Sequence, residues 1–319
     1  MVLSQPISPF RFSGDSDMVL HRTEETSERY RGIDFWPSAD VLSAIVSAQR
    51  EAIEAVGPAV PALAAAGEAV AERLRNGGRL IYVGAGSSGL LAQLDALELP
   101  GTFGIAADRL KVLIAGGREA LFDIPAGAED DAAAAEREID ALSVGSRDSV
   151  VAISASGRTP YAVAAMLKAR ARGALTIGIA SNPGTPLLTA AEHPVLLATP
   201  PEVIAGSTRM NAGTAQKCAL NMLSSLIGIR LGHVYEGMMV NLQAANDKLR
   251  HRAVGIVMRA VGVGETRAVQ SLEAVGGEVK AAIVLCAGAS DPREARRLLE
   301  SHGGDIRSTL AQMGHRASA

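Results

Sequence analysis

The chain has 319 residues, enough for one large domain with a small appendage, and 48% of them are hydrophobic. Its formal net charge is −3 and only 3% of its residues are aromatic, so nucleic-acid binding, which uses basic blocks and stacking side chains, is not expected. Cys218 and Cys286 lie in apolar helical stretches, which predicts buried free thiols and a reducing cytoplasm. Residues 1–17 do not resemble a secretory signal, and no run of about 20 apolar residues is free of charges, so we expect no membrane span.

The first part of the chain predicts a polar N-terminal arm at residues 1–37, followed by helices at 38–57 and 59–76. From residue 79 onward, apolar runs alternate with helical patterns. The predicted strands span 79–83, 110–115, 148–153, 175–180 and 194–198, and the helical patterns between them span 88–98, 129–142, 159–171 and 184–191. This alternation predicts an α/β fold with a parallel sheet covered by helices on both faces.

A long helical run follows at about 208–230, and short helices separated by glycine turns fill the remainder of the chain. We therefore expect three units. They are the arm at 1–37, an α/β domain with flanking helices at 38–245 and a small helical C-terminal module at 246–319.

Two turns rich in serine carry the strongest functional signal. The sequence GAGSSG at 84–89 and the sequence SASGRTP at 154–160 each follow a strand and precede a helix. Backbone N–H groups at a helix start, together with hydroxyl groups, make a site for a phosphate. The predicted phosphate contacts are Ser87, Ser88, Ser154, Ser156, Thr159 and the backbone of Gly157.

The first turn also matches the dinucleotide fingerprint GxGxxG, which leaves a nicotinamide-dependent oxidoreductase as an alternative. The acidic residue expected after the next strand is not evident, and two serines in the turn suit a phosphate monoester better. A P-loop is excluded because no Gly-Lys-Ser/Thr follows the glycines. Either turn alone is equally well explained as an ordinary tight turn.

Two glutamates are candidates for proton transfer. Glu98 is predicted near the C-terminus of the helix that begins at Ser88, where the helix dipole opposes its charge and favours the acid form. Glu129 is predicted to open the next helix, where a carboxylate is favoured for structural reasons alone and would suit a base. The six histidines are scattered without metal-ligand spacing, so we expect no metal site and no cofactor.

Short motifs occur in a specific order along residues 20–313. They are GRLIYVGAGSSG at 78–89, TFG at 102–104, IAGG at 114–117, GAED at 127–130, ASGRTPY at 155–161, SNPG at 181–184, GSTRM at 206–210, AGTAQK at 212–217 and NDKL at 246–249. In these motifs the chain resembles the N-acetylmuramic acid 6-phosphate etherases, which contain a sugar isomerase (SIS) domain. The resemblance implies a three-layer α/β/α SIS domain with a five-stranded parallel sheet and a C-terminal module like a ubiquitin-associated domain.

The resemblance also implies the reaction. It is cleavage of the D-lactyl ether of N-acetylmuramic acid 6-phosphate to N-acetylglucosamine 6-phosphate and D-lactate, in cytoplasmic recycling of cell-wall sugars by a homodimer. The catalytic glutamates of the family fall on Glu98 and Glu129, and the GSTRM motif adds Ser207 and Arg209 as substrate contacts. The partner implied is a phosphorylated amino sugar.

The chain departs from the family pattern at two positions that are usually basic, where it has Leu90 and Asn211. The loss of two cations near a phosphosugar site lowers the affinity that we expect for the substrate. A non-catalytic phosphosugar sensor is a second hypothesis from the same domain type, but a sensor has no need for both glutamates.

Overall fold

Five parallel strands form the central sheet of the computed structural model, which describes residues 22–123, 125–244 and 246–315. The spatial order is β2-β1-β3-β4-β5. The strands are β1 (Leu80–Gly84), β2 (Leu110–Ile114), β3 (Ser149–Ile153), β4 (Leu175–Ala180) and β5 (His193–Leu196). β1, β3 and β4 are buried along their whole length, which explains why their sequences are apolar without alternation.

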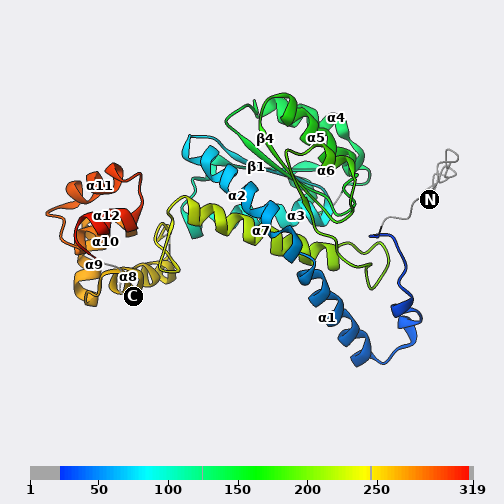
Figure 1. Cartoon of the computed structure of the whole chain (residues 1–319), viewed down its shortest axis with the longest axis horizontal. Helices are drawn as coiled ribbons and strands as arrows, with labels where there is room; N and C mark the ends of the chain where they lie inside the picture. Colours follow the sequence, from blue (N-terminus) through cyan, green and yellow to red (C-terminus); the bar gives the residue numbers. More distant parts are fainter. Residues whose placement is uncertain (1–21, 124, 245, 316–319) are drawn as a thin grey trace, which may run out of the picture.

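Helices cover both faces of this sheet, as Figure 1 shows. Side chains of β1 alternate between two hydrophobic cores, with Leu80 and Tyr82 in one and Ile81 and Val83 in the other. The first core is closed by α2 (Val60–Arg75), α3 (Gly86–Phe103) and α7 (Asn211–Arg230). The second is closed by α4 (Ala132–Ala141), α5 (Pro160–Ala171) and α6 (Pro186–Ala190). The predicted three-layer α/β/α fold is confirmed.

The helix α1 (Ser38–Glu54) contacts α7 and projects from the domain (Figure 1). A short 3-10 turn, η3 (Gly57–Ala59), joins it to α2 at the point where the two predicted helices meet. Within the described residues, the stretch Ser38–Arg75 is the one helical region long and apolar enough to cross a membrane by these two criteria alone. Its second half is α2, which lines the first hydrophobic core, and a buried core helix meets the same criteria.

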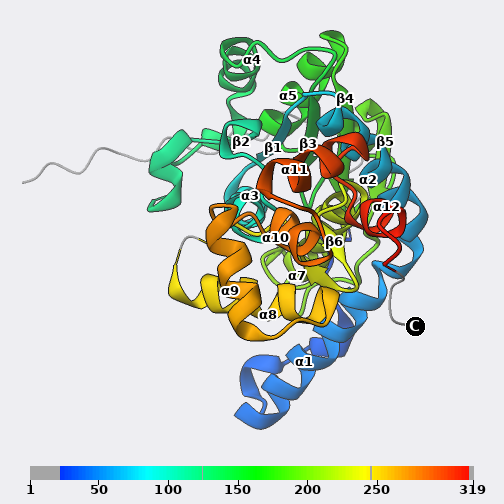
Figure 2. The same ribbon diagram turned by 90° about the vertical axis from the view of Figure 1, so that its left-hand side faces the viewer.

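Within residues 246–315, the C-terminal module contains five helices (Figure 2), and their buried side chains form a separate hydrophobic core. The helices are α8 (Asp247–Val261), α9 (Glu265–Ala274), α10 (Val279–Cys286), α11 (Pro292–Ser301) and α12 (Ile306–Gln312). Tyr235 and Val240 belong to this core, and a hairpin of β6 (Val234–Tyr235) and β7 (Met238–Met239) leads into it. The packing unit therefore begins before the expected boundary at 246.

One lysine of this module is unusually placed. The Lys280 ammonium donates a hydrogen bond of 2.8 Å to the carbonyl oxygen of Gly304 beside a cavity of about 810 Å³. Burial lowers the pKa of Lys280 to about 8, although Asp305 opposes the shift. Burial also lowers the pKa of the nearby His233 to about 4, and the charge of Lys280 adds to this effect.

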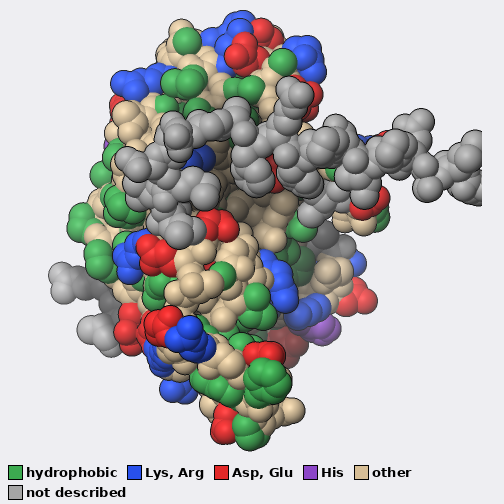
Figure 3. All heavy atoms as spheres, turned by 90° about the vertical axis from the view of Figure 1, so that its right-hand side faces the viewer, with side chains coloured by type: hydrophobic (Ala, Val, Ile, Leu, Met, Phe, Trp, Pro, Cys, Tyr) green, Lys and Arg blue, Asp and Glu red, His purple; other side chains and the backbone are tan. Residues whose placement is uncertain are grey.

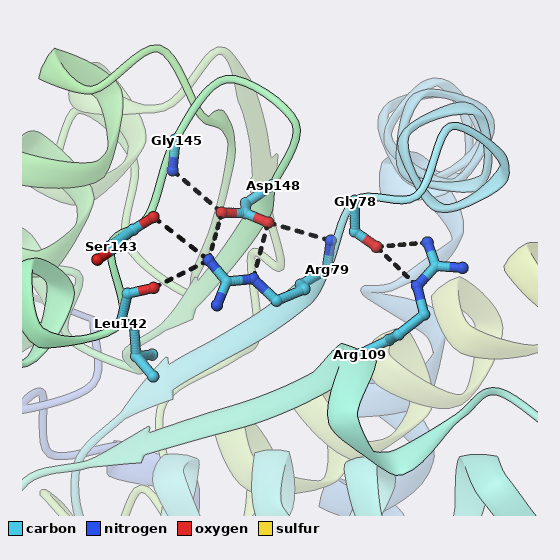
Figure 4. A network of polar contacts seen from close by, with 7 residues as sticks. All are labelled: Gly78, Arg79, Arg109, Leu142, Ser143, Gly145 and Asp148. Carbon is cyan, nitrogen blue, oxygen red and sulfur yellow. Dashed lines mark hydrogen bonds and ion pairs between the residues drawn. The ribbon is translucent and has the colours of Figure 1, made fainter.

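An ion pair fixes β1 against β3 at the ends of the strands where their chains enter the sheet (Figure 4). The Arg79 guanidinium donates to both carboxylate oxygens of Asp148, at 3.0 Å from Nε and 2.7 Å from Nη2. The backbone N–H groups of Arg79 and Gly145 donate to the same carboxylate. Burial alone would raise the pKa of Asp148, but these donors hold it below its usual value.

Candidate functional site

A cavity of about 550 Å³ lies at the carboxyl ends of the strands. The loops after β1, β2 and β3 line it, together with residues from the N-terminal arm and from the segment after β5. The described lining residues with polar side chains are Glu24, Ser87, Ser88, Glu129, Ser154, Ser156, Thr159 and Thr208. The structure thus brings both serine-rich loops into one pocket, as the sequence predicts.

The first loop passes from β1 into α3 with no room for a side chain at Gly84 or Gly89. A Cβ on Gly84 would lie 2.8 Å from the backbone nitrogen of Gly89, and a Cβ on Gly89 would lie 2.7 Å from a side-chain carbon of Ile114. This close approach places Ser87 and Ser88 in the first turn of α3, where backbone N–H groups lack partners within the helix. Ser88 is 8% exposed and donates a hydrogen bond of 2.9 Å to Gln216 on α7, which fixes its orientation.

The second loop is organised around Ser154. Its hydroxyl lies 2.8 Å from the Thr159 hydroxyl and 3.2 Å from the Ser156 hydroxyl, and it accepts a hydrogen bond of 3.0 Å from the N–H of Gly157. Gly157 has a φ of 69° and does not line the pocket. Its N–H is therefore used inside the loop, while the three hydroxyl groups face the cavity.

Glu129 lines the same pocket, but not at a helix start. It lies in the 3-10 turn η6 (Ala128–Asp130), and α4 begins at Ala132 with Asp131 as its N-cap, whose carboxylate accepts from the N–H of Ala134 at 2.8 Å. The predicted position of Glu129 at the start of a helix is therefore wrong, since Glu129 precedes α4 by three residues.

Glu98 does not line the pocket within its own chain. Its side chain is 60% exposed and lies 3.9 Å from the Lys217 ammonium. Ser88 and Glu98 are ten positions apart in the helix, which places them about 15 Å apart along its axis. The helix continues through Pro100 to Phe103, so Glu98 lies before the final turn and its predicted placement at the helix end is wrong.

The two further expected substrate contacts, Ser207 and Arg209, are absent from the described lining, whereas Thr208 between them is present. Leu90 is partly exposed on α3. Asn211 is buried, and its amide donates to the carbonyl oxygen of Pro201 at 3.0 Å and accepts from Gln49 at 3.1 Å. A neutral side chain thus occupies the second position at which the family pattern is basic.

Glu24 is a pocket residue that the sequence did not reveal. Its only signal was its place in a polar stretch of the predicted arm, which is typical of any solvated segment. Among the described residues, no group of three or more His, Cys, Asp or Glu side chains has the arrangement of a metal site.

Comparison with known proteins identifies the family. The chain is 46% identical over 291 residues to an N-acetylmuramic acid 6-phosphate etherase from Deinococcus radiodurans, covering 91% of this chain and 95% of that protein. The chain belongs to the N-acetylmuramic acid 6-phosphate etherase family. An etherase from Rubrobacter xylanophilus is also 46% identical, over 91% of this chain and 96% of its own length.

Domain comparisons agree with this family. Residues 62–170 match the model of the glucokinase regulatory protein N-terminal SIS domain, and residues 131–226 match the SIS domain model. A solved structure from Bacteroides fragilis, described as that of a phosphosugar isomerase involved in capsule formation, has a TM-score of 0.50 and 22% identity, covering 63% of this chain and 95% of that one. This likeness shows the fold alone.

Proposed function

We propose that the chain cleaves the D-lactyl ether of N-acetylmuramic acid 6-phosphate, giving N-acetylglucosamine 6-phosphate and D-lactate. One observation carries this proposal beyond family membership. Hydroxyl groups of both serine-rich loops, the first turn of α3 and the carboxylate of Glu129 all line one cavity of about 550 Å³. A phosphate held by neutral donors beside a carboxylate suits proton chemistry on the sugar.

The reaction follows from the chemistry of the open-chain sugar. The C1 aldehyde acidifies the proton on C2, and the ether oxygen on C3 is β to that carbonyl. One carboxylate removes the C2 proton, an acid protonates the departing lactate oxygen, and water then adds to the double bond at C3. Such general acid and base groups each contribute about 10² to 10⁴-fold. We assign these two tasks to Glu98 and Glu129.

The position of Glu98 indicates how it would reach a substrate. Leu90, Leu94 and Leu97 are exposed on α3, and their spacing of four and three residues places them on one face of the helix. Glu98 follows Leu94 by four residues and lies on the same face. We propose that a second copy of the chain covers this apolar face in a homodimer and receives Glu98 at its own pocket.

Two variants test the assignment. Glu98→Gln and Glu129→Gln keep the side-chain shape and remove titration, so each should reduce D-lactate release by at least 10²-fold. Exchange of the C2 proton with solvent deuterium should persist in the variant that lacks only the acid and vanish in the one that lacks the base. Full lactate release by both variants would contradict the etherase mechanism and leave a phosphosugar sensor.

Mixing the two inactive variants tests the shared site. In a mixed dimer, one pocket regains Glu98 from one chain and Glu129 from the other, while the second pocket lacks both. Random exchange of subunits should therefore restore about a quarter of wild-type activity, because half of the dimers are mixed and half of their pockets are intact. Two unmixed variants at the same total concentration are the control, and no recovery after proven exchange would contradict the shared site.

We also propose a cytoplasmic enzyme that binds neither nucleic acid nor membranes. Figure 3 supports the absence of nucleic-acid binding, because acidic and basic side chains are interspersed over the face that it shows. The net charge of −3 also gives no general attraction to a polyanion.

A further inference from the structure

Glu24 and Glu129 line the same pocket from two different segments of the chain. Glu129 belongs to the segment that follows β2, at one edge of the sheet. Glu24 lies against the segment that connects β5 to α7, because a Cβ on Gly206 would lie 3.1 Å from the Glu24 carboxylate. The serine-rich loops follow β1 and β3, which lie between β2 and β5 in the sheet. The pocket is therefore lined by two carboxylates from distant parts of the sequence.

The residue before Glu24 anchors the arm at the pocket. Thr23 is 3% exposed, and its carbonyl oxygen accepts a hydrogen bond of 3.1 Å from the N–H of Gly206. Its hydroxyl accepts a hydrogen bond of 3.1 Å from the buried amide of Asn182. The same amide nitrogen lies 3.3 Å from the carbonyl oxygen of Ser156, so Asn182 joins the arm directly to the second serine-rich loop.

The chemistry of the lining limits what Glu24 can bind. An ionised carboxylate only accepts hydrogen bonds, so it repels a phosphate and attracts hydroxyl and amide N–H groups. The described lining contains no Lys or Arg side chain with which Glu24 would pair. Within the described residues, its carboxylate also forms no ion pair.

We infer that Glu24 contacts the substrate, and that its carboxylate accepts hydrogen bonds from hydroxyl or amide N–H donors of the sugar while the serine-rich loops hold the phosphate. The identity of that sugar rests on the proposed function. Thr23 and Asn182 are positioning residues that hold Glu24 at the pocket.

Steady-state kinetics of the full-length protein test this role. Glu24→Ala should raise KM for N-acetylmuramic acid 6-phosphate by about 10- to 100-fold, because a hydrogen bond to a charged group contributes about 1.5–3 kcal/mol. Its kcat should stay within about threefold of wild type if the contact is uniform between ground and transition states. The inhibition constant of inorganic phosphate should not rise, because the phosphate loops are intact and the substitution removes a carboxylate that repels the phosphate. Glu25→Ala is the matched control, since Glu25 is the next residue and does not line the pocket.

A second variant tests the anchor. Thr23→Val preserves shape and removes the hydroxyl that accepts from Asn182, so it should raise the same KM by a smaller factor without changing phosphate inhibition. An unchanged KM in Glu24→Ala would overturn the inference. So would an equal loss of phosphate inhibition, because that result indicates a distorted loop rather than a lost sugar contact.

Calorimetric binding of N-acetylglucosamine 6-phosphate separates this inference from the proposed function. A wild-type protein that releases no lactate but binds this phosphosugar more tightly than Glu24→Ala does would refute the etherase activity and support the Glu24 contact. An active enzyme with equal binding and equal KM in both forms would refute the contact alone.

Discussion

Gly157 is the residue of the second serine-rich loop at which a single methyl group should have the largest effect. Its φ of 69° lies in the left-handed region, which costs an L-residue about 1–2 kcal/mol. A Cβ there would lie 2.3 Å from the Thr185 hydroxyl oxygen and 2.7 Å from the Thr185 Cβ. Thr185 is fully buried, so the loop must move or the core must yield, at a further cost of about 1–3 kcal/mol.

Gly157→Ala should therefore lower the free energy of unfolding by about 2–5 kcal/mol, measured by urea denaturation at about 25 °C. Gly184→Ala is the matched control, because Gly184 has a similar φ of 65° but a Cβ there would have no atom within 4 Å. The control should lose only about 1–2 kcal/mol. The alanine at 157 should also raise KM, since the loop carries Ser154, Ser156 and Thr159. Equal destabilisation by the two variants would refute the steric argument.

Three further predictions concern the phosphate, the β1–β3 ion pair and the C-terminal module. Ser88→Ala and Ser156→Ala should each raise KM more than they lower kcat, because phosphate contacts are largely uniform along the reaction; unchanged KM values would exclude these residues as ligands. Arg79→Ala should lower the free energy of unfolding, measured in urea at about pH 7.5, by about 3–5 kcal/mol, because it leaves the buried Asp148 carboxylate without its cation. Adding Asp148→Asn to this variant should recover part of the loss. With a pKa of about 8 in the folded chain and about 10.4 when unfolded, Lys280 binds fewer protons in the folded state between these values. Stability should thus rise with pH in this window by about 3 kcal/mol more in wild type than in Lys280→Met, and equal slopes would contradict the burial of the ammonium.

The sheet could be predicted from the sequence because its strands are buried on both faces. In the run 149–153 every residue after the first is apolar, which is typical of a strand buried on both faces. The observed β3 spans Ser149–Ile153. The end of α3 could not be predicted from local signals. The helical pattern at 88–98 predicted an end before Pro100, but Leu99 and Phe103 are both buried, and their packing keeps the last turn helical.

The site was predictable where it depends on loops next to strands. Ser87, Ser88, Ser154, Ser156, Thr159 and Glu129 all line the cavity because the carboxyl ends of parallel strands share one edge. Glu24 could not be found in this way, since its place depends on the contact of Thr23 with Asn182, which are 159 residues apart in the sequence. The sequence also could not place Glu98 at a pocket, because Glu98 lies on the exposed face of α3 and not at the pocket of its own chain.

The charge of the pocket leads to a last prediction. Its described lining contains hydroxyl groups, backbone N–H groups and the carboxylates of Glu24 and Glu129, but no Lys or Arg side chain. A phosphate dianion held in this way gains no attraction that salt would screen, and it is repelled by both carboxylates. Raising NaCl from about 0.05 M to about 0.5 M, which shortens the Debye length from about 14 Å to about 4 Å, should therefore leave KM within about twofold or lower it. A wild-type KM that rises steeply with salt would show that a cation outside the described lining binds the phosphate.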